Sequence, residues 1–314
     1  GINTVATAAS NQIETLNLSG NGAAVTYEIT GAATTYNITG DKDVTISGSE
    51  VAFDGKTVTD SSTGTSTIKI TTLDDADLSK AVVDNIIVAS NGTAKTLTLA
   101  DNSTITLASD LTTSFTLAGK ATDYTVNLAT ADDTNASGAV IDIVTGSLTV
   151  SFIDALNINA TIGKLTATTT TASSTTAIQI FGTKDVNLGA LTAQVVASTS
   201  TGDLSFDAAS AALTTVVTGA GDDTIVMDQA AVVSVITGAG DDVVTAASSA
   251  SSTYSTGAGL DIVNLNTANA IVVDTGAGVD TVRIADDVDS NATIVGGSGI
   301  DTIIFLEDSS GSVA

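Results

Sequence analysis

The 314-residue chain contains no proline, cysteine, histidine or tryptophan, and its aromatic residues are four tyrosines and six phenylalanines. Without cysteine the protein has no disulfides and no thiolate metal sites. Without histidine it lacks the commonest general base, and no cysteine nucleophile is available. Carboxylate pairs can hydrolyse sugars, but tryptophan platforms for a sugar cleft are missing here. We therefore do not expect an enzyme.

Basic residues are scarce as well, with nine lysines and arginines against 35 aspartates and glutamates, which gives a net charge of −26. Nucleic acid is a poor partner for such a chain because phosphate contacts require clusters of basic residues. Cations are the simplest partners for an acidic surface. No run of about 18 apolar residues is present, so no transmembrane segment is predicted.

The hydrophobic residues make up 43% of the chain, which argues against a disordered tail. They are mainly alanine, valine, isoleucine and leucine, so we expect a thin core of stacked aliphatic side chains. The chain begins with glycine and has no visible signal peptide, which is typical of a fragment of a longer protein.

Glycines punctuate the second half of the chain at intervals of 17 to 21 residues. Such a period indicates a repeat architecture. The last five units also repeat in residue type, reading TGAGDD, TGAGDD, TGAGLD, TGAGVD and GGSGID. The turn glycines are Gly146, Gly163, Gly182, Gly202, Gly219, Gly238, Gly257, Gly276 and Gly297.

Two apolar columns accompany the last five glycines, one six residues after each glycine and one three residues before it. The first column is Ile225, Val244, Val263, Val282 and Ile303, and the second is Val216, Val235, Tyr254, Val273 and Ile294. Each unit therefore has two short strands and cannot bury its apolar face alone, whereas units stacked about 4.8 Å apart can. The sequence predicts an all-β protein with a parallel β-solenoid, or β-roll, of about 19 residues per coil over 146–314.

Residues 1–145 are predicted to form a β-rich domain with less regular repeats. The segments LTLA, ITLA and FTLA, at 97–100, 105–108 and 115–118, recur at about half the coil length. A solenoid, a meander and a sandwich are all compatible with this spacing. We place a boundary between about 130 and 150, and we predict a short helix over 73–85.

The aspartates of the repeat would stack in the predicted solenoid about 5 Å apart, where two like charges repel by roughly 3 kcal/mol. A cation between neighbouring aspartates would remove this repulsion. Glycines allow the turns to direct carbonyl oxygens toward one point, and a set of oxygen ligands selects Ca²⁺. These aspartates are Asp223, Asp242, Asp261, Asp280 and Asp301, whereas Asp222 and Asp241 are predicted to face solvent.

The five units resemble the repeats-in-toxin (RTX) nonapeptide, G-G-x-G-x-D-x-U-x, in which U is a large aliphatic residue. The resemblance implies that turns of adjacent coils share Ca²⁺, with the five aspartates as ligands and about four ions between five turns. It also implies that turn carbonyls complete the sites, at Thr218, Gly219, Ala220, Gly221, Thr237, Gly238, Ala239, Gly240, Thr256, Gly257, Ala258, Gly259, Thr275, Gly276, Ala277, Gly278, Gly296, Gly297, Ser298 and Gly299.

The repeat departs from the family pattern in two ways. Four units begin with threonine, and only 296–304 matches the pattern fully. The second turn of each coil lacks the motif, so sites are expected on one edge only. The shorter acidic clusters at 41–43, 73–77, 131–133 and 285–289 are interpreted as solvated loops.

The composition together with this repeat resembles RTX-type bacterial surface-layer proteins. The resemblance implies an extracellular structural protein that is exported by a one-step (type I) channel and folds and self-assembles into a lattice on binding Ca²⁺. It also implies a cell-surface anchor, to lipopolysaccharide or another component, outside this chain. The alternative is a stalk or adhesin segment, or an RTX module, of a larger type I-secreted protein.

Overall fold

The computed structural model describes most of the chain and divides it into two compact units, residues 1–163 and 164–314. The predicted boundary between 130 and 150 lies before this division. No helix of the described residues is long and apolar enough to pass through a membrane. The residues described are 1–5, 13–31, 33–89, 95–108, 114–120, 125–130, 133–134, 140–141, 143–172, 177–208, 214–228, 233–246, 251–266, 271–285 and 292–306.

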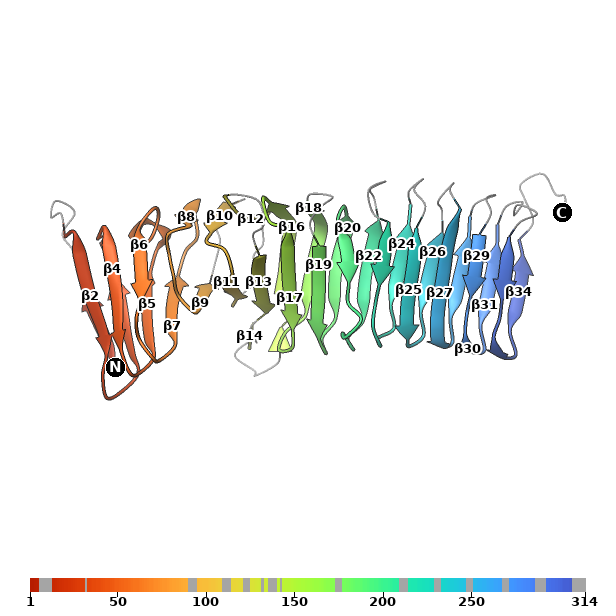
Figure 1. Cartoon of the computed structure of the whole chain (residues 1–314), viewed down its shortest axis with the longest axis horizontal. Helices are drawn as coiled ribbons and strands as arrows, with labels where there is room; N and C mark the ends of the chain where they lie inside the picture. The colour runs from red at the N-terminus through yellow and green to blue at the C-terminus, as the bar shows by residue number, and fades with distance from the viewer. Residues whose placement is uncertain are drawn as a thin grey trace. The chain divides into compact units, whose positions relative to one another are not determined.

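Unit 1 consists of short strands connected by turns (Figure 1). Its elements are β1 (Ile2–Val5), β2 (Thr15–Gly20), β3 (Val25–Ile29), β4 (Thr35–Gly40), β5 (Val44–Gly48), the 3-10 helix η1 (Glu50–Ala52), β6 (Thr57–Asp60), β7 (Ser66–Ile70), β8 (Ala76–Leu78), β9 (Asn85–Val88), β10 (Lys95–Leu99), β11 (Ser103–Leu107), β12 (Phe115–Ala118), β13 (Thr125–Thr130), β14 (Asp133–Thr134), β15 (Val140–Ile141), β16 (Ile143–Ser151) and β17 (Ala155–Ala160).

Apart from β14 and β15, the paired strands of unit 1 belong to successive coils and are not neighbours in sequence. One sheet runs β1–β3–β5–β7–β9–β11–β13–β17, and every pair in it is parallel. The sheets β2–β4–β6 and β8–β10–β12–β16 are parallel too. A meander or sandwich would require antiparallel neighbours, and in the described part of unit 1 only β14 and β15 pair in that way. Unit 1 is therefore a solenoid.

The predicted helix over 73–85 is wrong. The segment contains strand β8 and the start of β9, and Leu73, Ala76, Leu78 and Ala81 are buried against the coil interior. The prediction rested on the aspartates early in the segment and on Lys80 after them, but Asp74, Asp75 and Lys80 are exposed residues of a solenoid coil. Strand β10, which pairs with β8 in parallel, satisfies the backbone groups that a helix would have paired internally, so tertiary context overrides the local preference.

Unit 2 has the same architecture with a more regular coil (Figure 1). Its strands are β18 (Leu165–Ala172), β19 (Ala177–Gly182), β20 (Val186–Leu191), β21 (Gln194–Val196), β22 (Leu204–Ala208), β23 (Thr215–Val217), β24 (Thr224–Met227), β25 (Ser234–Ala239), β26 (Val243–Ala246), β27 (Ser252–Gly259), β28 (Ile262–Leu265), β29 (Ile271–Asp274), β30 (Ala277–Gly278), β31 (Thr281–Ile284), β32 (Thr293–Val295), β33 (Ser298–Gly299) and β34 (Thr302–Phe305).

Two parallel sheets face each other across the core of unit 2. One sheet runs β18–β20–β22–β24–β26–β28–β31–β34. The other runs β19–β21–β23–β25–β27–β29–β32. Thr224 pairs with Val243, and Val243 with Ile262, so successive coils are 19 residues apart in this region. The predicted parallel β-solenoid with coils of this length is confirmed.

The two predicted apolar columns form the core of unit 2. Both columns are buried in every coil except the last, where Ile294 is partly exposed and Ile303 is 49% exposed. The column before the glycines comes from the sheet that contains β25, and the column after them comes from the sheet that contains β26. Tyr254 is the largest buried side chain in these columns, and valine and isoleucine make up the rest of the buried columns.

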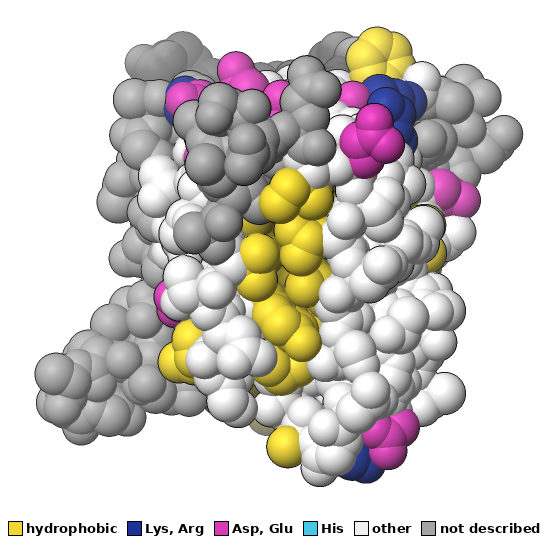
Figure 2. All heavy atoms as spheres, turned by 90° about the vertical axis from the view of Figure 1, so that its left-hand side faces the viewer, with side chains coloured by type: hydrophobic (Ala, Val, Ile, Leu, Met, Phe, Trp, Pro, Cys, Tyr) yellow, Lys and Arg dark blue, Asp and Glu magenta, His cyan; other side chains and the backbone are white. Residues whose placement is uncertain are grey.

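The first coil of unit 1 leaves part of its apolar interior uncovered. Figure 2 views this end and shows a column of hydrophobic side chains between polar walls. Leu16 and Tyr27 are partly exposed, whereas Tyr36 and Ile46, which follow them in register one coil later, are fully buried. The exposed column is therefore the cross-section of the solenoid core.

Candidate metal-binding turns

The five repeat aspartates each lie directly before a strand of unit 2, namely β24, β26, β28, β31 and β34. In-register pairing of these strands brings the aspartates into one column on one edge of the solenoid, which we call the inner column. Four of its members have at most 1% of their surface exposed, although they are acidic. These are Asp223, Asp242, Asp261 and Asp280.

One carboxylate oxygen of each inner-column aspartate is used to join two coils. The Asp223 amide donates to Oδ1 of Asp242 at 2.8 Å, and the Asp242 amide donates to Oδ1 of Asp261 at 2.9 Å. The ladder begins at the Leu204 amide, which donates to Asp223 at 2.7 Å, and ends at Asp301, which accepts from Asp280 at 3.1 Å. Each Oδ1 atom therefore replaces a missing backbone acceptor at the turn.

The other carboxylate oxygen, Oδ2, is buried and has no hydrogen-bond partner in Asp223, Asp242, Asp261 and Asp280. The nearby threonine hydroxyls do not satisfy it, because each has one proton and donates it to the next turn. Thr218 Oγ1, for example, donates to the Thr237 carbonyl at 2.8 Å. A buried acceptor without a partner costs roughly 1 to 3 kcal/mol, and more when it is charged. Four in one column point to a missing positive group.

The electrostatics of the column agree with this view. Burial raises the pKa of Asp223 to about 6 and that of Asp242 to about 7, and the backbone amides that donate to Oδ1 oppose this effect only in part. Burial also raises the pKa of Asp261, and repulsion from Asp280 and Asp241 adds to the effect. The folded protein therefore disfavours these carboxylates as bare anions and favours them when they are neutralised.

The turn glycines are required because adjacent coils approach very closely. Gly257 has a φ of +100°, and a Cβ at this position would lie 1.9 Å from the Gly238 carbonyl oxygen. No side chain fits at that distance, and L-residues rarely adopt that φ. Gly238 and Gly257 face each other in register, as do Ala239 and Ala258. The glycine repeat is thus explained by coil stacking alone.

Some of the predicted carbonyl ligands already accept hydrogen bonds between coils. The carbonyls of Thr237, Thr256, Thr275 and Gly296 accept threonine hydroxyls, and those of Gly219, Ala258 and Gly276 accept backbone amides. A carbonyl has two lone pairs, so these bonds leave room for a second contact. The structure places all five predicted turns in one stacked column, with Asp301 on the last coil.

A second acidic column, which we call the outer column, runs beside the first on the exposed side. Asp222 and Asp241 face solvent, as predicted. The Asp241 amide donates to Oδ1 of Asp222 at 2.8 Å, and the Asp222 amide donates to Oδ1 of Asp203 at 2.9 Å. The Asp203 amide in turn donates to Asp185 at 3.2 Å. Sequence reasoning missed Asp203 and Asp185, although the glycine cadence passes through Gly202 directly before Asp203.

The two columns differ in direction and in solvation. Inner-column aspartates accept from the preceding coil, whereas outer-column aspartates accept from the following coil, as when Leu260 donates to Asp241 at 2.8 Å. In the outer column, Asp203, Asp222 and Asp241 are exposed to solvent and Asp185 pairs with Lys164, so the buried inner column is the candidate site.

Among the residues that the structure describes, no group of three or more acidic, histidine or cysteine side chains is placed to hold a metal ion. The inner column offers two carboxylates to each gap between coils, and backbone carbonyls would have to supply the remaining ligands. An all-oxygen set of this kind fits Ca²⁺. The orphaned Oδ2 atoms are the feature that makes the residues fit a cation.

No protein-family model matches the chain, and neither a curated protein sequence nor a solved structure is significantly similar to it.

Proposed function

We propose that unit 2 binds Ca²⁺ along the inner column and that the bound ions stabilise its stacked coils. The observation that carries the proposal is the set of four buried Oδ2 atoms without partners, one per coil in consecutive coils. The spacing of about 5 Å between neighbouring carboxylates suits an ion shared by two coils. Five turns enclose four gaps, and the ligand aspartates would be Asp223, Asp242, Asp261, Asp280 and Asp301.

A cation is favoured over protons as the neutralising group at neutral pH. Asp223 has a pKa of about 6, so it is mostly charged at pH 7, and Asp242, at about 7, is half charged. Ca²⁺ when bound supplies a positive charge that neutralises two carboxylates at once. Because an unfolded chain has no such site, binding free energy becomes folding free energy.

This coupling suits an extracellular structural protein exported unfolded. Where free Ca²⁺ is scarce, repulsion within the inner column opposes folding. Outside the cell, millimolar Ca²⁺ reverses the balance. We therefore propose an RTX-like calcium-binding protein of the bacterial cell surface that self-associates, as surface-layer subunits do.

Exposed apolar side chains on the last described coil of unit 2 suit self-association. Ile303 and Phe305 of the last described coil are 49% and 64% exposed, whereas Val282 and Ile284, their in-register partners in the preceding coil, are 3% and 5% exposed. A strand edge with exposed apolar side chains promotes pairing with another chain.

The same open end also suits the second candidate function, a stalk or module within a larger secreted protein, in which a further coil covers Ile303 and Phe305. Electron microscopy of the protein with Ca²⁺ separates the two functions. Sheets or ordered arrays are expected of a surface-layer subunit, and isolated particles at all concentrations would favour the stalk.

Calcium binding is tested by calorimetric titration of the protein and of two matched variants. Asp242→Asn in the inner column keeps an Oδ1 acceptor for the Asp223 amide but removes the charge. We expect it to lower Ca²⁺ affinity at least about tenfold and to make the metal-free protein more stable. Asp241→Asn, its neighbour in the outer column, serves as the control and should change neither property appreciably.

The outcomes separate a metal site from a merely structural ladder. No heat of binding from wild-type protein in millimolar Ca²⁺ would refute the proposal. Equal effects of the two substitutions would also contradict it, since Asp242, unlike Asp241, has a buried oxygen without a partner.

A further inference from the structure

The two broad faces of unit 2 carry almost no charge, although the chain has a net charge of −26. Face A is the outward side of β19, β21, β23, β25, β27, β29 and β32, and face B is the outward side of β20, β22, β24, β26, β28, β31 and β34. On these described strands, Asp274 is the only charged outward residue of face A, and Asp207 and Arg283 are the only ones of face B. The inner and outer acidic columns lie on the turn edge instead. Copies of the chain therefore repel one another least when they meet face to face.

Face A carries a row of exposed apolar side chains. Val196, Val217 and Ile236 follow one another in register in three consecutive coils. Val196 is 42% exposed and Ile236 is 44% exposed, and Phe181 of the preceding strand β19 is 39% exposed. Clustered apolar side chains on a protein surface mark an interaction site, and two sheets pack face to face by interdigitating such rows.

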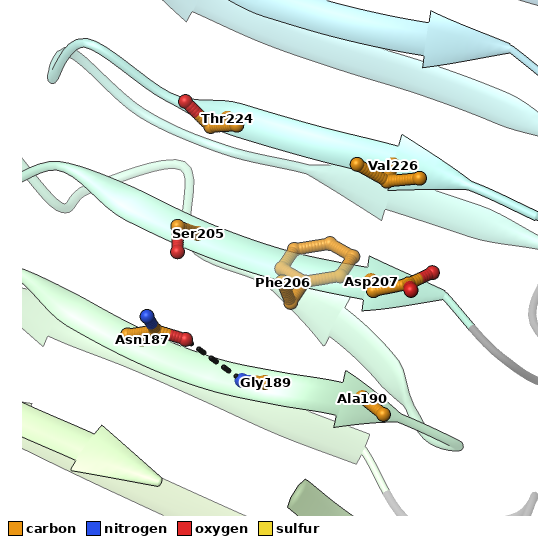
Figure 3. A pocket seen from close by; sticks show the side chains of 8 residues that line it. All are labelled: Asn187, Gly189, Ala190, Ser205, Phe206, Asp207, Thr224 and Val226. Carbon is orange, nitrogen blue, oxygen red and sulfur yellow. Dashed lines mark hydrogen bonds between the residues drawn. The ribbon is translucent and has the colours of Figure 1, made fainter. Parts of the chain in front are cut away.

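Face B has a shallow hollow of about 290 Å³ where β20, β22 and β24 lie side by side (Figure 3). A β-bulge produces it, because Asn187 pairs with Ser205 but the next pair in register is Gly189 with Phe206. The bulge leaves a gap in the outward side chains, and Phe206 and Val226 give the hollow a largely apolar lining. The hollow therefore suits an apolar side chain.

The apolar row of face A and the hollow of face B belong to the same coils. Strands β19, β21 and β23 alternate along the chain with β20, β22 and β24. A second copy that is displaced by translation, with its face A on face B of the first and its coils level, would place its Phe181 and Val196 against the hollow. The two faces are thus complementary in shape without any rotation between the copies.

The isolated charges of the two faces are complementary in the same arrangement. Asp274 is the last residue of β29 and Arg283 is the third of β31, and the two strands flank one turn. Among the described residues neither side chain forms an ion pair, and the Arg283 guanidinium donates to Asn264 at a long 3.4 Å. With coils level, Asp274 of one copy meets Arg283 of the next. Asp207 lies four coils from Arg283 in register, so it meets no acidic residue of face A.

We propose that unit 2 packs side by side with further copies of this chain by translation, face A of one copy on face B of the next. The inference rests on the proposed self-association and names the surfaces that carry it. Such a contact is heterologous and does not close, so it builds a row of copies. Seven strands of about four residues cover roughly 400 Å² per copy, which is less than the roughly 800 Å² per partner of stable complexes. A single contact is therefore weak, and rows form at high protein concentration.

Sedimentation velocity of the full chain at saturating Ca²⁺, over a range of protein concentrations, measures the contact. Asp274→Arg and Arg283→Asp each place like charges opposite one another, and each alone should raise the concentration needed for association about tenfold. An equimolar mixture of the two variants should restore association, because each then meets an opposite charge on both of its faces. Mixing rescues a contact between copies but does not rescue a folding defect.

Glu28→Arg, at an exposed position of β3 in unit 1, is the matched control. It changes the net charge as much as Asp274→Arg does and should leave association unchanged. Calorimetric titration checks separately that every variant still binds Ca²⁺. Single variants that associate as well as wild type, or a mixture that fails to restore association, would overturn the inference but leave the proposed function standing. Wild-type protein that stays monomeric at all concentrations would overturn both the inference and the proposed self-association.

Discussion

Unit 1 and unit 2 have the same solenoid architecture but treat their aspartates differently. In unit 1, Asp84 accepts both the amide and the hydroxyl of Ser66, and Asp77 forms an ion pair with Lys120 at 2.6 Å. In unit 2, four of the five inner-column aspartates, in consecutive coils, are buried and leave one oxygen without a partner. Two units of the same fold therefore differ in whether their own side chains and amides satisfy their carboxylates.

The distribution of basic residues explains part of the difference. Six of the nine lysines and arginines lie in unit 1, and only Arg283 lies within residues 218–304. Unit 1 can neutralise its aspartates with its own side chains, as in the pairs Lys42–Asp41 and Lys120–Asp77. Among the described residues no lysine or arginine pairs with the inner column, so a counter-charge for it would have to come from solution.

Removal of divalent cations should separate the two units most strongly. In chelator, we expect the amides of 214–306 to lose protection from hydrogen exchange, whereas those of 35–88 keep it. The reason is that only the inner column depends on an external positive charge. Hydrogen exchange followed by mass spectrometry measures both regions in one sample. Equal protection in both regions, with and without chelator, would show that the units do not differ in this respect.

Glycine substitutions should reveal how tightly the coils pack in each unit. Gly257→Ala places a Cβ 1.9 Å from a backbone oxygen, and we expect a loss of about 3 kcal/mol or more. Gly55 in unit 1 also has a positive φ, of +67°, but nothing lies within 4 Å of its Cβ position, so Gly55→Ala should cost about 1 kcal/mol. Urea unfolding at saturating Ca²⁺ measures both losses of stability. Similar losses would indicate that the positive φ, rather than the clash of the added Cβ, determines the cost.

The pH dependence of metal-free stability should have opposite signs in the two units. The pKa values of about 6 for Asp223 and about 7 for Asp242 exceed the ordinary value of 3.8. Stability from these groups is therefore complete below about pH 4 and is lost as pH rises through 6 to 7. Each tenfold increase in proton affinity on folding corresponds to a free energy on the order of 1 kcal/mol. In metal-free buffer, unit 2 should unfold at lower urea concentration at pH 8 than at pH 5.

Unit 1 should respond in the other direction and at lower pH. Burial of Asp77 opposes ionisation, but hydrogen bonds from Lys120 and Ser79 outweigh it and lower the pKa of Asp77 below 3.8. Its contribution is present above that value and is lost as pH falls further. Region-resolved exchange at pH 5 and pH 8 therefore should leave unit 1 unchanged. A rise in the stability of metal-free unit 2 with pH would contradict the assignment of the raised pKa values.

The smallest effect should come from the surface ion pairs. Lys120 pairs with Asp77 in unit 1, and Lys164 pairs with Asp185 at 2.5 Å in unit 2. All four side chains are at least a third exposed, so replacing either lysine with alanine should cost less than about 1 kcal/mol. Added salt should reduce that cost in urea unfolding. A larger loss of stability for Lys120→Ala would show that ion pairs with lysine stabilise unit 1 more than we infer.

Much of the fold follows from local repetition in the sequence. The glycine interval and the two apolar columns predict the coil length of unit 2, and Asp222 and Asp241 face solvent as expected. The helix over 73–85 was wrong because its charge order, aspartates followed by Lys80, is equally compatible with the exposed residues of a solenoid coil. The hollow on face B could not be predicted, since the bulge at Gly189 is a property of two strands in register and not of one segment.

The sequence by itself determined the stacking period and the acidic repeat, because both depend on residue types that recur along the chain. Only the tertiary structure decided which oxygen of each aspartate is occupied and which is left bare. Which oxygen has a hydrogen-bond partner depends on distances between atoms of adjacent coils, and no single segment of the sequence specifies those distances. The same limit applies to Phe305, whose exposure depends on what packs against the last described coil.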